Sequence, residues 1–206
     1  NLYSVYLTDQ LGLIETSSEN FKKLPYTFPV VWKIVKYGII GLGNIGTTHV
    51  GNFMKEGNIP NAVITAIADL KQVKIDNICS KYPEHKFDCY NSGEELIANA
   101  DVDAVIVAVP HYDHPRLCIM ALNKGINVIC EKPAGVYTKQ VKEMNEVAKK
   151  SNAHFAMMFN QRTKCVYRKM KEIIANGELG ELQRMTWIIT DWYRTQAYYD
   201  GGSWRA

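Results

Sequence analysis

The feature that most constrains the fold is a glycine-rich hexapeptide that directly follows a short apolar run. Residues 34–40 are β-branched and almost continuously apolar, which is typical of a strand covered on both faces of a parallel sheet. The next six residues, 41–46, read G-x-G-x-x-G. In this pattern Gly41 makes a tight turn, Gly43 lets the backbone approach a pyrophosphate, and Gly46 lets the following helix pack on the sheet.

The residues after the hexapeptide fit the same interpretation. A helix is expected over 45–56, and its first N–H groups, near Asn44 and Ile45, would offer a positive dipole end to phosphates. A second strand, 62–68, ends at Asp69, about 20 residues after the turn, where an acid reaches the ribose hydroxyls of a dinucleotide. Strand, turn, helix, strand and acid together favour dinucleotide binding over a purely structural glycine turn.

Composition narrows the class of protein. The 206 residues carry 24 Lys and Arg against 21 Asp and Glu, so neither a nucleic-acid-binding stripe nor an acidic tail is indicated. The five cysteines include no C-x-x-C pair, and their odd number argues against a disulfide framework or a zinc site. No apolar run approaches the roughly 18 residues of a membrane helix, and no signal peptide is recognised. We therefore expect a soluble, cytoplasmic protein that binds neither nucleic acid nor membrane.

The remaining pattern alternates between helix and strand up to about residue 160. It predicts a doubly wound parallel sheet, an α/β Rossmann fold, whose ligand crevice lies at the carboxyl ends of the strands. Residues 1–32 fit no element and form an unassigned leader, while 33–160 form the NAD(P)-binding domain. Beyond the elements already named, the expected strands are 86–90, 104–109, 126–130 and 153–159, and the expected helices are 71–81, 92–98, 114–123 and 138–150.

Residues 161–206 do not repeat this unit. A helix over 163–174 closes near Gly177 and Gly180, and 182–193 is rich in aromatic and β-branched residues, as in a longer strand. This pattern predicts the beginning of a second, α+β domain that is incomplete at residue 206.

Three segments directly after predicted strands would face the crevice. If a cofactor lies across the strand ends, its candidate contacts are Pro110 and His114 after the fourth strand, Glu131 and Lys132 after the fifth, and Arg162 after the sixth. Lys132 could donate to a substrate hydroxyl and stabilise the alkoxide that forms as hydride leaves. The alternative is a solvated surface lysine.

The glycine turn, the acid after the second strand, His114 and above all the Glu-Lys-Pro at 131–133 resemble the Gfo/Idh/MocA family of NAD(P)-dependent oxidoreductases. That family includes glucose–fructose oxidoreductase and inositol dehydrogenases, and the resemblance covers all of the chain except the leader. It implies that Lys132 contacts the reacting hydroxyl and takes part in a proton relay. It also implies that Trp204 and Arg205 contact the cofactor.

The same resemblance defines what these 206 residues lack. Members carry a histidine, the usual acid/base, on a helix beyond the position that corresponds to Ala206, so catalysis by this chain alone is not expected. The resemblance implies a sugar or polyol substrate, inositol-like ones included, NAD as the cofactor, and a homo-oligomer formed through the second domain. The alternative to a dehydrogenase is a non-catalytic dinucleotide-binding module or a redox sensor.

Two finer expectations concern geometry. The carboxylate of Asp69 would repel the 2′-phosphate of NADP, so NAD is preferred, with Lys71 offsetting part of the repulsion. The Lys132–Pro133 peptide is expected to be cis, because a cis X-Pro bond is inexpensive and would turn Lys132 back over the crevice. The family resemblance points the same way.

Other residues carry simpler interpretations. His49 in the first helix and His85 in a connection are expected to be structural or solvated. Tyr167 and Lys171 have the i, i+4 spacing of the Tyr-x-x-x-Lys pair of short-chain dehydrogenases. The glycine pattern of that family differs, so we assign the pair no catalytic role.

Overall fold

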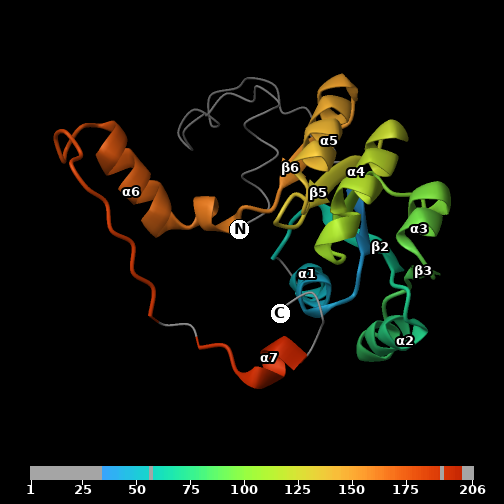
Figure 1. Ribbon diagram of the computed structural model, residues 1–206. Coiled ribbons are helices and arrows are strands. Elements are labelled where there is room, and N and C mark those ends of the chain that lie inside the picture. The colour runs from blue at the N-terminus through green and yellow to red at the C-terminus, as the bar shows by residue number, and fades with distance from the viewer. Residues whose placement is uncertain (1–33, 56–57, 191–192, 201–206) are drawn as a thin grey trace, which may run out of the picture. The chain divides into compact units, whose positions relative to one another are not determined.

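The computed structural model describes residues 34–55, 58–190 and 193–200. The chain divides into two compact units between Phe159 and Asn160. The first unit carries a six-stranded sheet, parallel throughout, in the order β3-β2-β1-β4-β5-β6 (Figure 1). Its strands are β1 (Val35–Ile40), β2 (Ala62–Ala68), β3 (Asp88–Tyr90), β4 (Ala104–Val107), β5 (Asn127–Cys130) and β6 (Phe155–Met157).

Helices cover both faces of this sheet. α1 (Asn44–Met54) and α2 (Gln72–Lys81) contribute to one buried cluster, and α3 (Gly93–Asn99), α4 (His114–Asn123) and α5 (Thr138–Lys150) contribute to the other (Figure 1). Each cluster packs against one face, so α1 and α2 lie in one layer and α3, α4 and α5 lie in the other. This is the doubly wound α/β arrangement predicted from the alternation of strands and helices.

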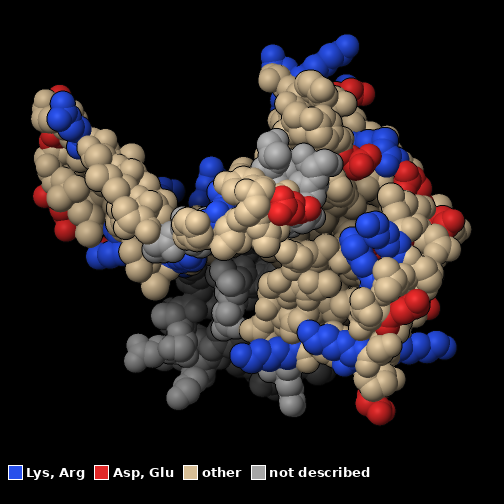
Figure 2. Space-filling model, turned by 60° about the horizontal axis from the view of Figure 1, so that its bottom comes forward, with Lys and Arg blue, Asp and Glu red and all other residues tan. Residues whose placement is uncertain are grey.

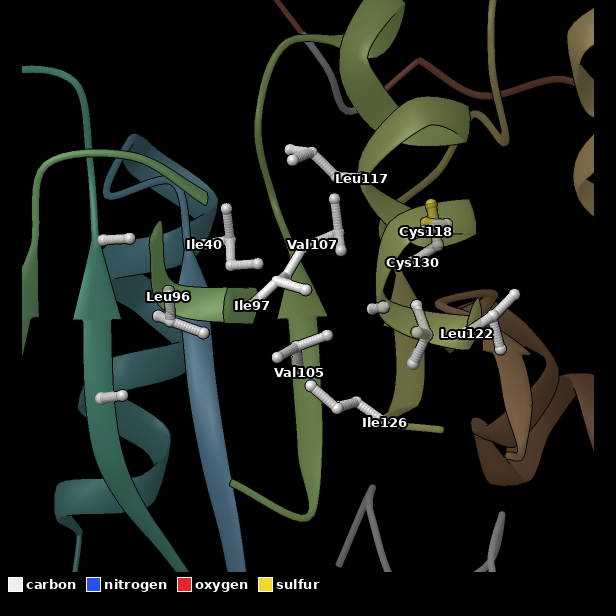
Figure 3. Packing of buried hydrophobic residues seen from close by; sticks show 14 of the residues in the cluster. Ile40, Leu96, Ile97, Val105, Val107, Leu117, Cys118, Leu122, Ile126 and Cys130 are labelled. Atoms are coloured by element: carbon white, nitrogen blue, oxygen red, sulfur yellow. The ribbon is translucent and has the colours of Figure 1, made fainter. Parts of the chain in front are cut away.

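The central strand β4 shows why these strands read as continuous apolar runs. All four of its residues are buried. Val105 and Val107 face the cluster of α3 and α4, while Ala104 and Ile106 face the cluster of α1 and α2, as the two-residue period of a strand requires. In Figure 3, Val105 and Val107 lie under side chains of α3 and α4. A strand covered on both faces has no position for a polar side chain.

The predicted helices and strands of the first unit are confirmed, with small differences at their ends. β4 ends at Val107, before the expected Val109, because the chain leaves the sheet there and enters the short 3₁₀ helix η2 (His111–Asp113).

The second unit differs from the prediction. It contains the 3₁₀ helix η3 (Asn160–Thr163), α6 (Cys165–Ala175) and a short unexpected helix, α7 (Gln196–Asp200). Gly177 and Gly180 both have positive φ after α6, as expected for residues that end a helix. The strand expected over 182–193 is wrong for its described residues: 182–190 and Tyr193 form no strand. An apolar segment becomes a strand only beside a hydrogen-bonded neighbour, and no described segment pairs with this one.

The surface carries charges of both signs. Figure 2 shows Lys and Arg side chains and Asp and Glu side chains on the same face of the molecule. In the described part of the chain, no helix combines the length and the hydropathy needed to cross a bilayer.

Candidate functional site

The glycine turn lies between β1 and β4, whose following helices cover opposite faces of the sheet. Gly41 N donates to Ala68 O at the end of β2, and Ala108 N donates to Ile40 O at the end of β1, each at 2.8 Å. Gly41 has a φ of +94°, and a Cβ there would lie 2.6 Å from the carbonyl oxygen of Ala108. The structure therefore confirms the tight turn that the sequence predicts at this glycine.

The other two glycines have different neighbours. A Cβ on Gly46 would overlap the carbonyl oxygen of Gly41, so the absence of a side chain lets α1 pack against the turn. A Cβ on Gly43 would meet nothing within 4 Å. The backbone at Gly43 therefore faces open space of the kind a pyrophosphate enters, and the residues of this turn fit a dinucleotide.

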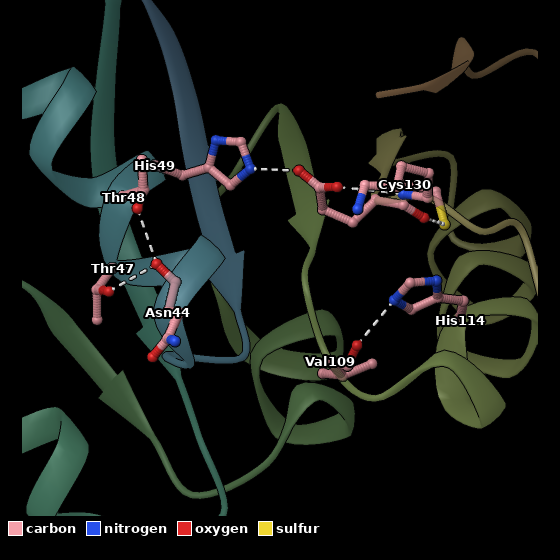
Figure 4. A network of polar contacts seen from close by, with 9 residues as sticks. Asn44, Thr47, Thr48, His49, Val109, His114 and Cys130 are labelled. Carbon is pink, nitrogen blue, oxygen red and sulfur yellow. Dashed lines mark hydrogen bonds and ion pairs between the residues drawn. The ribbon is translucent and has the colours of Figure 1, made fainter. Parts of the chain in front are cut away.

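The first turn of α1 offers its backbone N–H groups beside that space. The N-cap is Gly43, so no side chain caps the N–H groups of this turn. The first turn also contains no acidic residue. The hydroxyls of Thr47 and Thr48 donate backwards to the carbonyl oxygen of Asn44, so they act on the helix and not on a ligand (Figure 4). Asn44 and Ile45 are exposed. An anionic group at this end would meet N–H donors and the positive end of the helix dipole.

The carboxylate of Asp69 is tied to the glycine turn. Its Oδ2 accepts from Leu42 N at 2.8 Å and from Lys74 Nζ at 3.0 Å, and its Oδ1 accepts from Lys71 N at 3.0 Å. The side chain is buried, while that of Lys74 is 36% exposed. Lys71 was expected to offset part of the repulsion between Asp69 and a 2′-phosphate. In the structure Lys71 donates its backbone N–H to Asp69, and the ammonium that contacts the carboxylate is that of Lys74.

The Glu-Lys-Pro segment follows β5 at the same edge of the sheet. Glu131 N donates to Val107 O at 2.9 Å, which places the segment beside the end of β4. The Lys132–Pro133 peptide is cis, as predicted. Lys132 is exposed, whereas Glu131 is buried. Lys132 is therefore an exposed residue at the sheet edge where β4 and β5 end, on a segment that Glu131 holds in the fold.

A buried pair joins this segment to the helix that follows the glycine turn. Nε2 of His49, in α1, lies 2.8 Å from Oε1 of Glu131, and the two side chains are 5% and 6% exposed (Figure 4). Glu131 Oε2 also accepts from Lys132 N at 3.2 Å. Sequence reasoning treated His49 as structural or solvated and did not foresee its partner. The pair ties α1 to the segment that carries Lys132.

His114 supports the same segment from the other side. It lies at the start of α4 and is fully buried. Its Nδ1 is 2.7 Å from Pro133 O and its Nε2 is 2.8 Å from Val109 O. Its neighbour His111 has a pKa below the usual value because of burial, and then because of the positive charges of His114 and Lys132. His111 is therefore near enough to Lys132 to sense its charge, and sequence reasoning did not single this histidine out.

The remaining candidates lie in other segments of the chain. Pro110 is exposed and is the N-cap of η2, three residues after the end of β4. Arg162 lies in η3, in the second unit. Trp204 and Arg205 lie outside the described residues.

Two residues to which the sequence assigns no catalytic role, His85 and Tyr167, make structural contacts. His85 Nε2 lies 2.7 Å from Ile64 O, and its ring packs on Phe87. Tyr167 of α6 packs its ring against Trp187 within the second unit. All five cysteines are free, and no cluster of three metal-binding side chains occurs among residues 34–55, 58–190 and 193–200.

Comparison with known proteins identifies the first unit. Residues 35–159 match the family model GFO_IDH_MocA, described as an oxidoreductase family with an NAD-binding Rossmann fold. The myo-inositol 2-dehydrogenase of Thermotoga maritima is 33% identical over 147 residues, which are 71% of this chain and 42% of that protein. The glucose-6-phosphate 3-dehydrogenase of Bacillus subtilis is 29% identical over 71% of this chain and 40% of its own length.

A solved structure gives the same assignment. The scyllo-inositol dehydrogenase of Lactobacillus casei, with bound NAD(H) and scyllo-inositol, has a TM-score of 0.68 and 27% sequence identity. The match covers 72% of this chain and 43% of that one. The chain thus spans about two fifths of the length of the relatives it matches.

Proposed function

We propose a function from the premise that this chain belongs to the Gfo/Idh/MocA family of NAD-binding oxidoreductases. The protein transfers hydride between NAD and a hydroxyl or carbonyl group of a sugar or polyol. The observation that carries the proposal is the placement of Lys132: it is exposed at the sheet edge that holds the glycine turn, on a segment anchored to α1 through Glu131 and His49.

Each part of the site has a definable task. The turn at 41–46 and the first turn of α1 bind the pyrophosphate, and Asp69 accepts hydrogen bonds from the ribose hydroxyls. NAD, when bound, supplies the hydride acceptor. Lys132 donates to the carbinol oxygen and stabilises the negative charge that develops there. A protonated lysine donates but does not accept, so the hydroxyl proton passes to another group, which the family resemblance places on a histidine beyond residue 206.

The substrate class follows from the relatives. The myo-inositol and scyllo-inositol dehydrogenases among them act on cyclic polyols, as their names state, and this supports an inositol-like substrate here. The glucose-6-phosphate relative makes a sugar phosphate the main competitor. We further propose a cytoplasmic location, which five free cysteines support, and a homo-oligomer built through the second domain.

The test compares two proteins. The 206-residue chain should bind NADH in a fluorescence titration but show negligible turnover, because the first unit contains the nucleotide site while the proton acceptor is not among its assigned residues. The gene product that carries this chain should oxidise at least one member of a panel of inositols, aldoses and sugar phosphates. NADH binding without turnover by that gene product would favour a non-catalytic module, and absence of NADH binding by either protein would refute the proposal.

Asp69 should set the preference for NAD. A 2′-phosphate about 4 Å from the carboxylate would cost roughly 4 kcal/mol at an effective dielectric constant of about 20, and Lys74 offsets part of this. We therefore expect a preference of at most about 100-fold for NAD over NADP. The isosteric change Asp69→Asn should reduce it roughly tenfold, measured as dissociation constants by calorimetry. Asp76→Asn, an exposed acid on α2, is the matched control, and equal affinities of the unaltered chain for both cofactors would contradict the assignment of Asp69.

A further inference from the structure

The ring of His114 lies between two hydrogen-bond acceptors. Carbonyl oxygens stand 2.7 Å from Nδ1 and 2.8 Å from Nε2, the first belonging to Pro133 and the second to Val109. A neutral imidazole carries one N–H and one lone pair, so it can satisfy only one carbonyl group. At the other nitrogen, two lone pairs would face each other at hydrogen-bond distance. A ring with both nitrogens protonated satisfies both contacts.

We propose that His114 is held as a doubly protonated imidazolium, whose two N–H groups fix the segment carrying Lys132 to the end of β4. Val109 is the second residue after β4, and Pro133 directly follows Lys132. A hydrogen bond donated by a charged N–H group is stronger than one donated by a neutral group. The ring therefore acts as a rigid tie between the two segments. His114 is in this sense a positioning residue, and its link to catalysis rests on the function proposed for Lys132.

The surroundings of the ring are consistent with a positive charge. The groups that face it are Cys130 of β5, the ring of His111 at a centroid distance of 5.7 Å and, through Cys130, the thiol of Cys118 and the carboxylate of Glu131. Burial lowers the pKa of His114, but its contact with Cys130 and its bonds to the two carbonyl groups raise it above the usual value overall.

The thiol of Cys130 is the nearest titratable group on β5. Its pKa is lowered to about 6, first by the contact with Cys118 and then, against burial, by His114. Figure 4 shows both His114 and Cys130, together with the bond between His114 and the carbonyl group of Val109. Lys132, which lowers the pKa of His111, is exposed. Solvent and salt therefore screen its repulsion of a positive charge on the buried ring of His114.

The first experiment measures the protonation of the ring directly. In the 206-residue chain with ¹⁵N-labelled histidine, both ring nitrogens of His114 should give the shifts of a protonated imidazole near pH 8, where an ordinary histidine is neutral. His154, which is exposed, serves as the internal control. The variant His114→Gln assigns the signal. One protonated and one unprotonated nitrogen at His114 near pH 8 would overturn the proposal.

The second experiment tests the positioning. In His114→Gln, hydrogen exchange at the amides of Lys132 and residues 134–136 should be at least roughly tenfold faster, while amides of β1 and β4 stay unchanged. His154→Gln is the matched control. Unchanged exchange in the segment, with His114→Gln folded, would show that the ring does not hold it. Neither measurement uses turnover, so failure of the polyol assay would leave this result standing, and an unfolded variant would leave the protonation measurement to decide.

Discussion

Replacing Gly46 with alanine is expected to destabilise the first unit by about 3 kcal/mol or more and to abolish NADH binding. The new Cβ would overlap the carbonyl oxygen of Gly41, and backbone on both sides of the contact leaves no flexible side chain to move away. Relief requires α1 to shift away from the turn, which displaces the N–H groups that receive the phosphates. Denaturant unfolding measures the loss of stability, and a fluorescence titration measures the loss of affinity.

Gly43→Ala is the matched substitution, because its Cβ would meet nothing within 4 Å and its φ of −76° suits any residue. Its stability should stay within about 1 kcal/mol of the unaltered chain. Its affinity for NADH should fall roughly 10- to 100-fold, because the methyl group takes space that the pyrophosphate needs. A Gly43→Ala chain that binds NADH normally would place the pyrophosphate elsewhere, and a Gly46→Ala chain of normal stability would mean that α1 can move without cost.

Lys132→Ala is expected to lower turnover by the gene product that carries this chain roughly 100- to 1,000-fold, the usual effect of removing one donor to a developing oxyanion. Lys132 is exposed, and within the described part of the chain its amine makes no contact on which the fold depends. Glu131 and Pro133 beside it carry the bonds that anchor the segment. NADH affinity should therefore change less than about twofold, a difference too small to matter on the scale of binding free energies.

Steady-state kinetics with the best polyol of the panel would separate the two effects. Lys142→Ala, which removes an exposed lysine from α5, is the control and should leave both turnover and NADH affinity unchanged. Retention of more than a tenth of the turnover by Lys132→Ala would remove this residue from the reaction, and His111 would become the next candidate. The imidazole of His111 lies close enough to Lys132 for the lysine charge to lower its pKa.

The fold and the glycine turn could be predicted because their signals are local. Strand and helix periods are read within a few residues, and the roles of Gly41 and Gly46 follow from backbone chemistry that any Rossmann turn must satisfy. The strand expected over 182–193 could not be judged in this way. Its aromatic and β-branched residues indicate a preference, but pairing depends on a neighbouring segment that no local pattern contains.

The supporting contacts of the site were missed because they join distant parts of the chain. His49 and Glu131 are 82 residues apart, and they meet only because β1 and β5 flank β4. The contact of Lys74 with Asp69 depends on where α2 begins, and Lys71 falls at its N-cap with Lys74 inside its first turn. Helix ends are the least determined feature of a sequence pattern, so the lysine that meets Asp69 could not be chosen from the sequence.

The position of β1 in the sheet has a consequence for how the chain folds. β1 is the first strand of the described chain, yet it lies at the centre, paired on one side with β2 and on the other with β4. During synthesis the β2 side closes early, while the other edge of β1 keeps its N–H and C=O groups unpaired until residues 104–107 emerge. Pairing across that separation is slow because a long loop must close first. The nascent half-sheet therefore presents an apolar edge to other chains throughout this interval, and the dinucleotide crevice, which needs both sides of β1, is completed only when the interval ends.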